Sequence, residues 1–174
     1  MIIERKEYLE KLIAWKDKQL IKIVTGVRRC GKSMLLEIYR NYLKEHGIEE
    51  EQIISINFED LDYEELTDYR KLYKYLKKRL IDGKMTYIFL DEIQNVTDFP
   101  KVLDSLYIKK NIDIYVTGSN AYMLSSEIAT MISGRYIQIE MLPLSFKEYM
   151  ESTGSMNDRG IKYAEYLQNS SFPF

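Results

Sequence analysis

The segment that most restricts how this chain can fold is GVRRCGKS, at positions 26–33. It follows a short β-branched run, Leu20 to Thr25, and precedes a helical pattern that begins near Lys32. It matches G-x-x-x-x-G-K-[ST], a loop whose glycines let successive backbone N–H groups turn inward around phosphate oxygens. The following helix directs the positive end of its dipole at the same point. The segment therefore predicts a strand, a phosphate-binding loop and a helix, in that order.

Each side chain near this loop has an expected part in holding a nucleotide. Lys32 would reach the β- and γ-phosphates and act in catalysis. The Ser33 hydroxyl would bind Mg²⁺, which prefers hard oxygen ligands. Arg28 and Arg29 would either touch phosphate or point toward a partner. The predicted nucleotide-binding residues are Gly26, Val27, Arg28, Arg29, Cys30, Gly31, Lys32, Ser33 and Met34.

An acidic pair, Asp91 and Glu92, ends the apolar run Tyr87 to Leu90. The run is short and uninterrupted, which is typical of a buried strand in a parallel sheet. An Asp at the tip of a strand beside a phosphate loop can hold Mg²⁺ through its water shell, so Asp91 is the second expected metal ligand. Glu92 is the expected catalytic base, because a carboxylate within reach of a water can orient and deprotonate it. Taken alone, the pair could also be a solvated strand end.

Strands and helices alternate along the rest of the chain. Apolar runs predict strands over 20–25, 53–58, 87–90, 112–117 and 136–141. Apolar residues at helical spacing predict helices over 8–15, 32–47, 66–80, 99–109, 121–132, 145–151 and 158–168. This alternation predicts an α/β fold with a mainly parallel sheet and helices on both faces. Ligands in such sheets bind at the carboxyl ends of the strands.

Two further polar segments are weaker candidates. Thr117 to Asn120 ends the fourth expected strand, and Ser119 or Asn120 would sense the γ-phosphate if that strand lies between the first and third. These residues could equally form a plain turn. Arg135, just before the fifth strand, is either an arginine finger, in cis or from a neighbouring subunit, or a surface arginine.

Composition limits the function classes. The chain has 174 residues, 25 basic and 27 acidic, with a net charge of -2, which does not suggest bulk attraction to nucleic acid or lipid. A single Cys and a single His argue against an internal disulfide and a zinc or haem site. The charged N-terminus is unlike a signal peptide, and no apolar run nears the ~18 residues of a membrane span. The expected compartment is a reducing cytoplasm, with no membrane partner.

The order of the motifs resembles a known family. GVRRCGKS, INFED, IFLDEIQ, TGSN and SGRYIQIEMLPLSFKEY are similar to segments of the prokaryotic AAA-type ATPases whose core precedes a C-terminal domain of unknown function. The similarity covers almost the whole chain, and the stretch from Gly134 to Tyr149 is its family-specific part. The resemblance implies a three-layer P-loop NTPase with strand order 5-1-4-3-2, ATP as nucleotide, Mg²⁺ as metal and Glu92 as base. It also favours Arg135 as a finger, since AAA+ proteins carry one just before the fifth strand.

The expected domain organisation follows from this resemblance. Residues 1–142 would form the ATPase core with an N-terminal amphipathic helix. Residues 143–174 would form the helical start of a C-terminal region, which we expect to be truncated.

The favoured function is Mg-dependent ATP hydrolysis, with self-association completing the site through Arg135. A GTPase is disfavoured because no N-K-x-D segment occurs, and a small-molecule kinase because the Asp-Glu pair suits water activation better. The alternative is an ATP-gated module that binds a protein or DNA partner and hydrolyses slowly or not at all.

Two minor features complete the candidates. Lys71, Lys74 and Lys78 share one face of the helix over 66–80, which is either a solvated face or a DNA contact. Cys30 lies beside a helix N-terminus and a lysine, which predicts a lowered thiol pKa. Alternatively, Cys30 is simply a small residue that fits.

Overall fold

The computed structural model describes residues 3, 5–119, 130, 132–153 and 159–168. A five-stranded sheet in the order β2-β3-β4-β1-β5 forms its centre, and each neighbouring pair is parallel. The strands are β1 (Ile21–Gly26), β2 (Ile53–Asn57), β3 (Thr86–Asp91), β4 (Ile112–Gly118) and β5 (Tyr136–Met141). Counted from the other edge this is 5-1-4-3-2, so the order implied by the family resemblance is confirmed.

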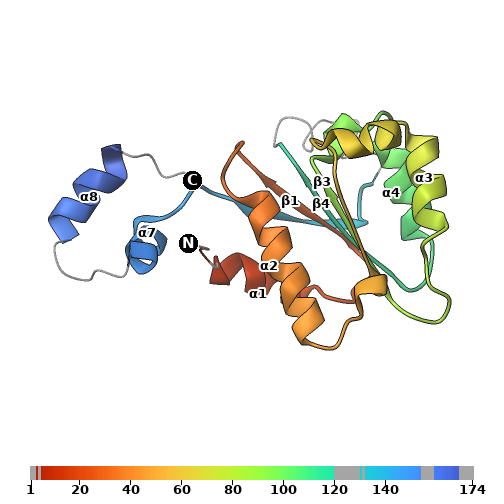
Figure 1. Ribbon diagram of the computed structural model, residues 1–174, viewed down its shortest axis with the longest axis horizontal. Helices are drawn as coiled ribbons and strands as arrows, with labels where there is room; N and C mark the ends of the chain where they lie inside the picture. Colours follow the sequence, from red (N-terminus) through yellow and green to blue (C-terminus); the bar gives the residue numbers. More distant parts are fainter. Residues whose placement is uncertain (1–2, 4, 120–129, 131, 154–158, 169–174) are drawn as a thin grey trace.

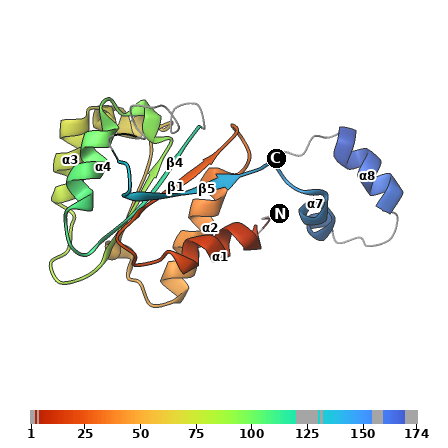
Figure 2. The same cartoon turned by 180° about the vertical axis from the view of Figure 1, so that it is seen from behind.

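Helices cover both faces of the sheet (Figures 1 and 2). One face packs against α1 (Lys6–Ala14) and α2 (Lys32–Glu45), and the other against α3 (Tyr69–Lys77) and α4 (Phe99–Tyr107). After β5 come α7 (Phe146–Thr153) and α8 (Arg159–Gln168), to one side of these layers (Figure 1). Short 3₁₀ turns are η1 (Glu50–Gln52), η2 (Leu61–Thr67) and η3 (Ile93–Asn95). The predicted three-layer α/β fold is confirmed, and no helix in the described part is long and apolar enough to cross a bilayer.

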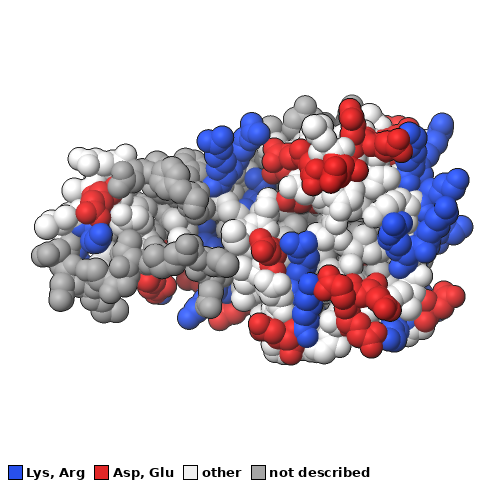
Figure 3. All heavy atoms as spheres, in the orientation of Figure 1, with Lys and Arg blue, Asp and Glu red and all other residues white. Residues whose placement is uncertain are grey.

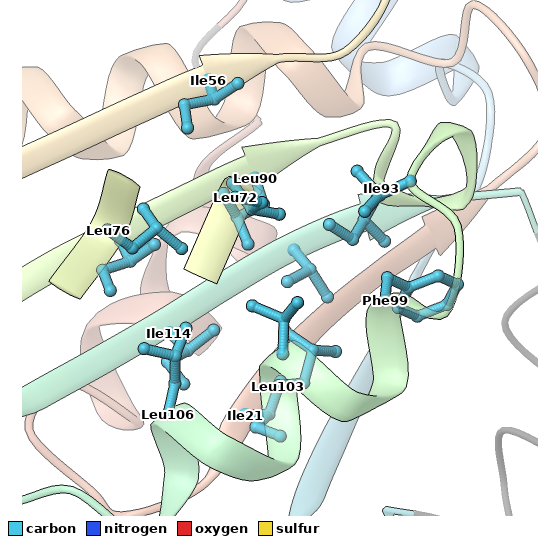
Figure 4. Packing of buried hydrophobic residues seen from close by; sticks show 14 of the residues in the cluster. Ile21, Ile56, Leu72, Leu76, Leu90, Ile93, Phe99, Leu103, Leu106 and Ile114 are labelled. Atoms are coloured by element: carbon cyan, nitrogen blue, oxygen red, sulfur yellow. The ribbon is translucent and has the colours of Figure 1, made fainter. Parts of the chain in front are cut away.

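The interior strand β3 shows why the strands are uninterrupted apolar runs. Ile88 and Leu90 face α3 and α4, whereas Tyr87 and Phe89 face α2. All four are buried, because alternate side chains of a strand point to opposite faces of a sheet covered on both. Each buried aliphatic side chain of this size contributes about 1.5–3 kcal/mol to folding. Figure 4 shows the α3–α4 side of this core, where Leu72, Leu76, Leu103 and Leu106 lie near Ile21, Ile56, Leu90 and Ile114.

The helix predicted over 66–80 is wrong in its extent. The chain first forms η2, and α3 begins only after Asp68. The Asp68 carboxylate accepts hydrogen bonds from the backbone N–H groups of Arg70 and Lys71, at 2.9 and 3.0 Å. This N-cap starts a new helix and separates it from the preceding turn. Leu80, expected on the same helical face, lies beyond the end of α3.

Helix ends elsewhere show one confirmed and one wrong prediction. Gly47 has a φ of +86° and follows α2, and the Ile48 N–H donates to the Leu43 carbonyl at 3.0 Å. This is a Schellman arrangement, so the predicted glycine cap is confirmed. By contrast, α1 ends at Ala14, and Trp15, expected on its apolar face, is 38% exposed. The helix predicted over 121–132 lies outside the described residues except at 130 and 132.

A buried ion pair joins the amino ends of β1 and β4. The Lys22 ammonium contacts the Asp113 carboxylate, and both side chains are at most 1% exposed. Lys22 also donates to the Lys18 carbonyl at 2.7 Å. Asp113 accepts further hydrogen bonds from the Asp17 N–H at 2.8 Å and the Tyr115 hydroxyl at 2.7 Å. The sequence does not reveal this pair. Each charged residue stands alone within a mostly apolar strand, and nothing in the strand pattern indicates which residue of another strand it contacts.

Candidate functional site

The loop over 26–33 leaves the carboxyl end of β1 and enters α2 at Lys32. Two of its residues have a left-handed backbone conformation, with φ values of +65° at Arg29 and +100° at Gly31. Conformations of this kind turn successive N–H groups to one side and form an anion-binding concavity. At the loop entrance a Cβ on Gly26 would lie 2.4 Å from the Met141 carbonyl oxygen, so only glycine fits there.

Lys32 lies between the loop and the acidic motif. Its side chain is buried, and its ammonium donates to the carbonyls of Gly26 and Val27 at 3.4 and 3.3 Å. The same nitrogen is 3.5 Å from the Glu92 carboxylate. The first helical residue after the loop and the first residue after β3 therefore meet, although the two lie far apart in sequence.

Thr117 of β4 holds the acidic motif in place. Its buried hydroxyl donates to the Asp91 carboxylate and accepts the backbone N–H of Glu92 at 2.8 Å. Glu92 has a φ of +54°, a left-handed conformation that is uncommon for a residue with a side chain. These contacts are possible because β4 lies between β1 and β3 in the sheet. This is the strand position that the sequence analysis required for the end of β4 to lie at the site.

A pocket of about 330 Å³ opens in front of these groups. Its volume is within the usual range of small-molecule sites. Among the predicted residues it contains Arg28, Lys32, Glu92 and Ser119, whereas Asn120 lies outside the described residues. The lining residues are Arg28, Lys32, Glu59, Glu92, Gln94, Asn95 and Ser119.

Three of these lining residues were missed by sequence reasoning. Gln94 donates to the second carboxylate oxygen of Glu92. Asn95 donates to the Phe58 carbonyl at 3.2 Å, and exposed Glu59 is 3.2 Å from the Arg28 guanidinium. Their positions in the sequence could have identified them as site residues. Each follows a strand whose carboxyl end lies at the same edge of the sheet, where ligands bind.

The expected metal ligands are one hydroxyl and one carboxylate. Ser33 is exposed on the first turn of α2, and Asp91 is 8% exposed at the end of β3. Among the described residues there is no group of three or more His, Cys, Asp or Glu side chains able to hold a metal ion. Mg²⁺ is commonly held by one or two protein oxygens together with substrate phosphates and water, so this donor set fits magnesium beside a bound nucleotide.

Arg135 lies at the opposite end of the sheet from the phosphate loop. Its carbonyl accepts the N–H of Ile21, the first residue of β1, at 2.8 Å. Since β1 is six residues long, at ~3.3 Å per residue the loop is roughly 15–20 Å away. The guanidinium pairs with Asp104 of α4 and lies 5.5 Å from the centre of the Tyr107 ring. In this arrangement Arg135 is remote from the loop of its own chain.

The expectation for Cys30 is corrected by its burial. The side chain is 0% exposed, and desolvation raises the pKa of the thiol despite the opposing effect of Lys32. Burial disfavours the thiolate more than the nearby positive charge favours it. Of the two interpretations, a thiol with a lowered pKa or a small residue that fits, the second is the one that its burial supports.

The comparisons with known proteins agree with this geometry. A profile of the AAA domain family matches residues 18–150. The chain belongs to this family. The AAA domain contains the phosphate loop and the acidic motif, and membership associates the chain with nucleotide-dependent activity.

Two curated relatives extend well beyond this AAA domain. An uncharacterized protein of Haemophilus influenzae is 40% identical over 176 residues, which cover 99% of this chain and 44% of the relative. An uncharacterized protein of Methanocaldococcus jannaschii is 37% identical over 136 residues, which cover 75% of this chain and 28% of the relative. The chain therefore spans less than half the length of the curated relatives it matches.

Solved structures share the fold at low sequence identity. The Aeropyrum pernix ORC1 protein in complex with DNA has a TM-score of 0.61 and 12% identity, over 88% of this chain and 50% of that one. PCH-2 of C. elegans has a TM-score of 0.56 and 14% identity, over 95% of this chain and 44% of that one. These similarities show that both structures share the three-layer α/β fold of this chain.

Proposed function

We propose that this AAA domain binds ATP with Mg²⁺ and hydrolyses it. The observation that supports the proposal is the 3.5 Å approach of the Lys32 ammonium to the Glu92 carboxylate in the pocket. A cation suited to holding a terminal phosphate thus lies beside a base suited to activating water. A phosphate loop alone would support binding, and the adjacent carboxylate is what adds hydrolysis.

In the proposed reaction, the loop N–H groups and Lys32 hold the β- and γ-phosphates. Ser33 and Asp91 would hold Mg²⁺, which would supply positive charge to neutralise the phosphate oxygens. Glu92 accepts a proton from a water molecule as the water oxygen bonds to the γ-phosphorus, and the bond between that phosphorus and the bridging oxygen of ADP breaks. Gln94 and Thr117 orient the Glu92 carboxylate and backbone. The products are ADP and inorganic phosphate.

Replacement of Glu92 by Gln tests this assignment. We expect E92Q to bind ATP with an affinity close to that of the unmodified chain, measured by calorimetry. Its hydrolysis rate should fall by about 10²–10⁴-fold, because general base catalysis is lost. E45Q is the matched control, since Glu45 is exposed at the far end of α2 and should leave both quantities unchanged. Equal turnover in E92Q and the unmodified chain would eliminate Glu92 as the base.

The alternative function is an ATP-gated interaction module. In this case the unmodified chain binds Mg-ATP but shows no turnover above that of E92Q, and nucleotide binding alone orders a surface for a partner.

One observation favours nucleic acid as such a partner. The α3 helix presents Arg70, Lys71, Lys74 and Lys77, all exposed, and contains no acidic residue. Figure 3 shows basic side chains gathered at the side of the molecule where α3 lies. Lys78 and Arg79 directly after the helix extend the row. We propose this surface, the α3 basic face, as a contact for the phosphate backbone.

We further propose that residues 1–142 form the ATPase core and that residues 143–174 begin a second region. The β1–β5 sheet and α1–α4 lie within the first range, whereas α7 and α8 lie within the second.

A further inference from the structure

Arg5 is a buried arginine that the proposed reaction does not use. It directly precedes α1, is 5% exposed and has a left-handed backbone with a φ of +46°. A charged side chain is rarely buried to this extent unless several groups pair with it. A non-glycine residue in the left-handed region also needs surrounding contacts to hold it there.

The guanidinium of Arg5 joins three separate segments. One terminal nitrogen donates to the carbonyl of Cys30, inside the phosphate loop, at 3.2 Å. The other donates to the carbonyl of Leu142, directly after β5, at 2.7 Å. Its Nε lies 2.7 Å from the carboxylate of Glu148 on α7. The planar guanidinium thus donates two hydrogen bonds to carbonyls in fixed directions while its charge pairs with a carboxylate, a geometry that the point charge of an ammonium on a flexible stem does not reproduce.

The two ends of the phosphate loop both reach the end of β5. Gly26, where the loop begins, pairs with Met141, and its Cα lies so close to the Met141 carbonyl that no side chain fits. Cys30, near the other end, reaches the next residue, Leu142, through Arg5. Tyr8 adds to this joint, because its hydroxyl accepts the Leu142 N–H at 3.2 Å and its ring lies 4.8 Å from the Arg5 guanidinium.

The contact of Arg5 on α7 is at the helix cap. One Glu148 oxygen accepts the N–H and the hydroxyl of Ser145 at 2.8 Å each, and the Ser145 hydroxyl accepts the Glu148 N–H at 3.3 Å. This is a capping box, which fixes the first turn of the helix. The other Glu148 oxygen is the one paired with Arg5. Arg5 therefore holds the direction in which the chain leaves the sheet and enters α7.

We infer that Arg5 is a positioning residue that couples the phosphate loop to the placement of α7. Any change in the backbone at Cys30 when the loop is occupied alters the same guanidinium that holds Leu142 and Glu148. The coupling is reciprocal, so the placement of α7 changes the affinity of the loop for its ligand. The inference rests on the proposed function for the identity of that ligand, which is ATP.

The first experiment needs no nucleotide. Hydrogen exchange is measured for the amides of residues 27–35 in the unmodified chain, E148Q and E165Q. Glutamine is accepted at this position of a capping box, so E148Q keeps the start of α7 while removing the charge that pairs with Arg5. E165Q removes an equal charge from α8, where Glu165 pairs with Lys162 and touches Tyr149 but not Arg5. We expect exchange in the loop to be about fivefold faster, or more, in E148Q and unchanged in E165Q.

The second experiment measures Mg-ATP affinity by calorimetry in the same variants and in R5K. We expect E148Q and R5K each to weaken ATP binding by about fivefold or more, whereas E165Q binds normally. The double variant R5K/E148Q should be no weaker than R5K alone, since both changes break one connection.

The outcomes separate the inference from the proposed function. If the unmodified chain binds no ATP, the proposed function fails, and loop exchange in E148Q alone decides the coupling. If ATP binds but E148Q matches the unmodified chain in both measurements, the coupling is overturned while the proposed function stands. If E165Q shows the same effects as E148Q, the loop responds to any loosening of α7 and α8, and the specific role of Arg5 is overturned.

Discussion

Single atoms determine the shape of the phosphate loop. Gly26 lies where β1 ends, next to the Met141 carbonyl, and Gly31 holds the left-handed conformation that lets α2 begin at Lys32. The buried Cys30 side chain lies next to Gly26, and its sulfur occupies space that any side chain at position 26 would need. The motif therefore specifies its glycines through steric contacts with distant parts of the chain as well as through local φ preferences.

Replacement of Gly26 by Ala should damage the loop. The new Cβ would lie 2.4 Å from the Met141 oxygen and 2.7 Å from the Cys30 sulfur, so backbone must move. We expect a loss of stability of about 1–3 kcal/mol, a Tm lower by roughly 2–12 °C and ATP binding weakened beyond detection by calorimetry. G160A is the matched control, because a Cβ at Gly160 meets nothing within 4 Å. An unchanged Tm and ATP affinity in G26A would contradict the steric argument.

At the scale of elements, two features do not follow from strand and helix periodicity. The Lys22–Asp113 pair links β1 and β4 below the site, and burial lowers the pKa of Lys22 while it raises the pKa of Asp113. Asp113, through Tyr115, also reaches Tyr39 of α2, whose hydroxyl is 2.9 Å from that of Tyr115. A polar network thus connects the sheet to the helix that begins at the phosphate loop.

Replacement of Lys22 by Met should destabilise the fold by about 3–5 kcal/mol at pH 7, because the buried Asp113 charge loses its partner. The pKa of Asp113 then rises further above its unfolded value, so stability is retained at low pH and lost as pH rises. Urea unfolding of K22M should therefore show a smaller deficit at pH 4 than at pH 7. The double variant K22M/D113N should recover part of the loss. A deficit that does not change with pH would refute this account of the pair.

The α3 basic face leads to a prediction about salt. The triple variant K71Q/K74Q/K78Q should bind duplex DNA more weakly than the unmodified chain in fluorescence anisotropy. The slope of log affinity against log salt should fall by about 1 for each phosphate contact removed. K11Q/K18Q/K147Q removes equal charge from exposed positions on α1, the following turn and α7. Equal losses in both triples, or no DNA binding in the unmodified chain, would eliminate this face as the contact.

At the scale of the whole molecule, Arg135 and the pocket lie at opposite ends of the strands. The loop, the acidic motif and the end of β4 meet at the carboxyl edge of the sheet, while Arg135 lies near its amino edge with Asp104 and Tyr107. Within one chain this arginine is remote from the pocket. A second copy can bring it to the pocket only if copies associate with the amino edge of one near the carboxyl edge of the next.

Mixing E92Q with R135A tests such association. E92Q retains Arg135 but lacks the base, whereas R135A retains the base but lacks the arginine. If Arg135 acts in trans, ATP turnover per protomer should rise with protein concentration, and an equimolar mixture should recover part of the activity that each variant lacks. Specific activity that is flat across a wide dilution series, together with R135A turnover equal to that of the unmodified chain, would show that the site is complete in one chain without Arg135.

The sequence by itself determined the features whose signal is local. The phosphate loop can be recognised because its glycines, Lys32 and Ser33 lie within the continuous segment 26–33. The buried strands can be recognised because both of their faces are apolar. The Asp68 cap was also present in the sequence as a helix-starting residue, but the apolar spacing across it concealed the break. Alternation of strands and helices then allowed the parallel sheet to be predicted.

Only the tertiary structure decided which distant groups meet. Thr117 with Asp91 and Lys22 with Asp113 are pairs between different elements, and periodicity within an element carries no information on its partner. Arg5 is the clearest case, because its charge near the start of the chain is typical of an exposed residue. Its burial depends on a loop, a strand end and a helix cap that come together only when the parallel strands close into one sheet.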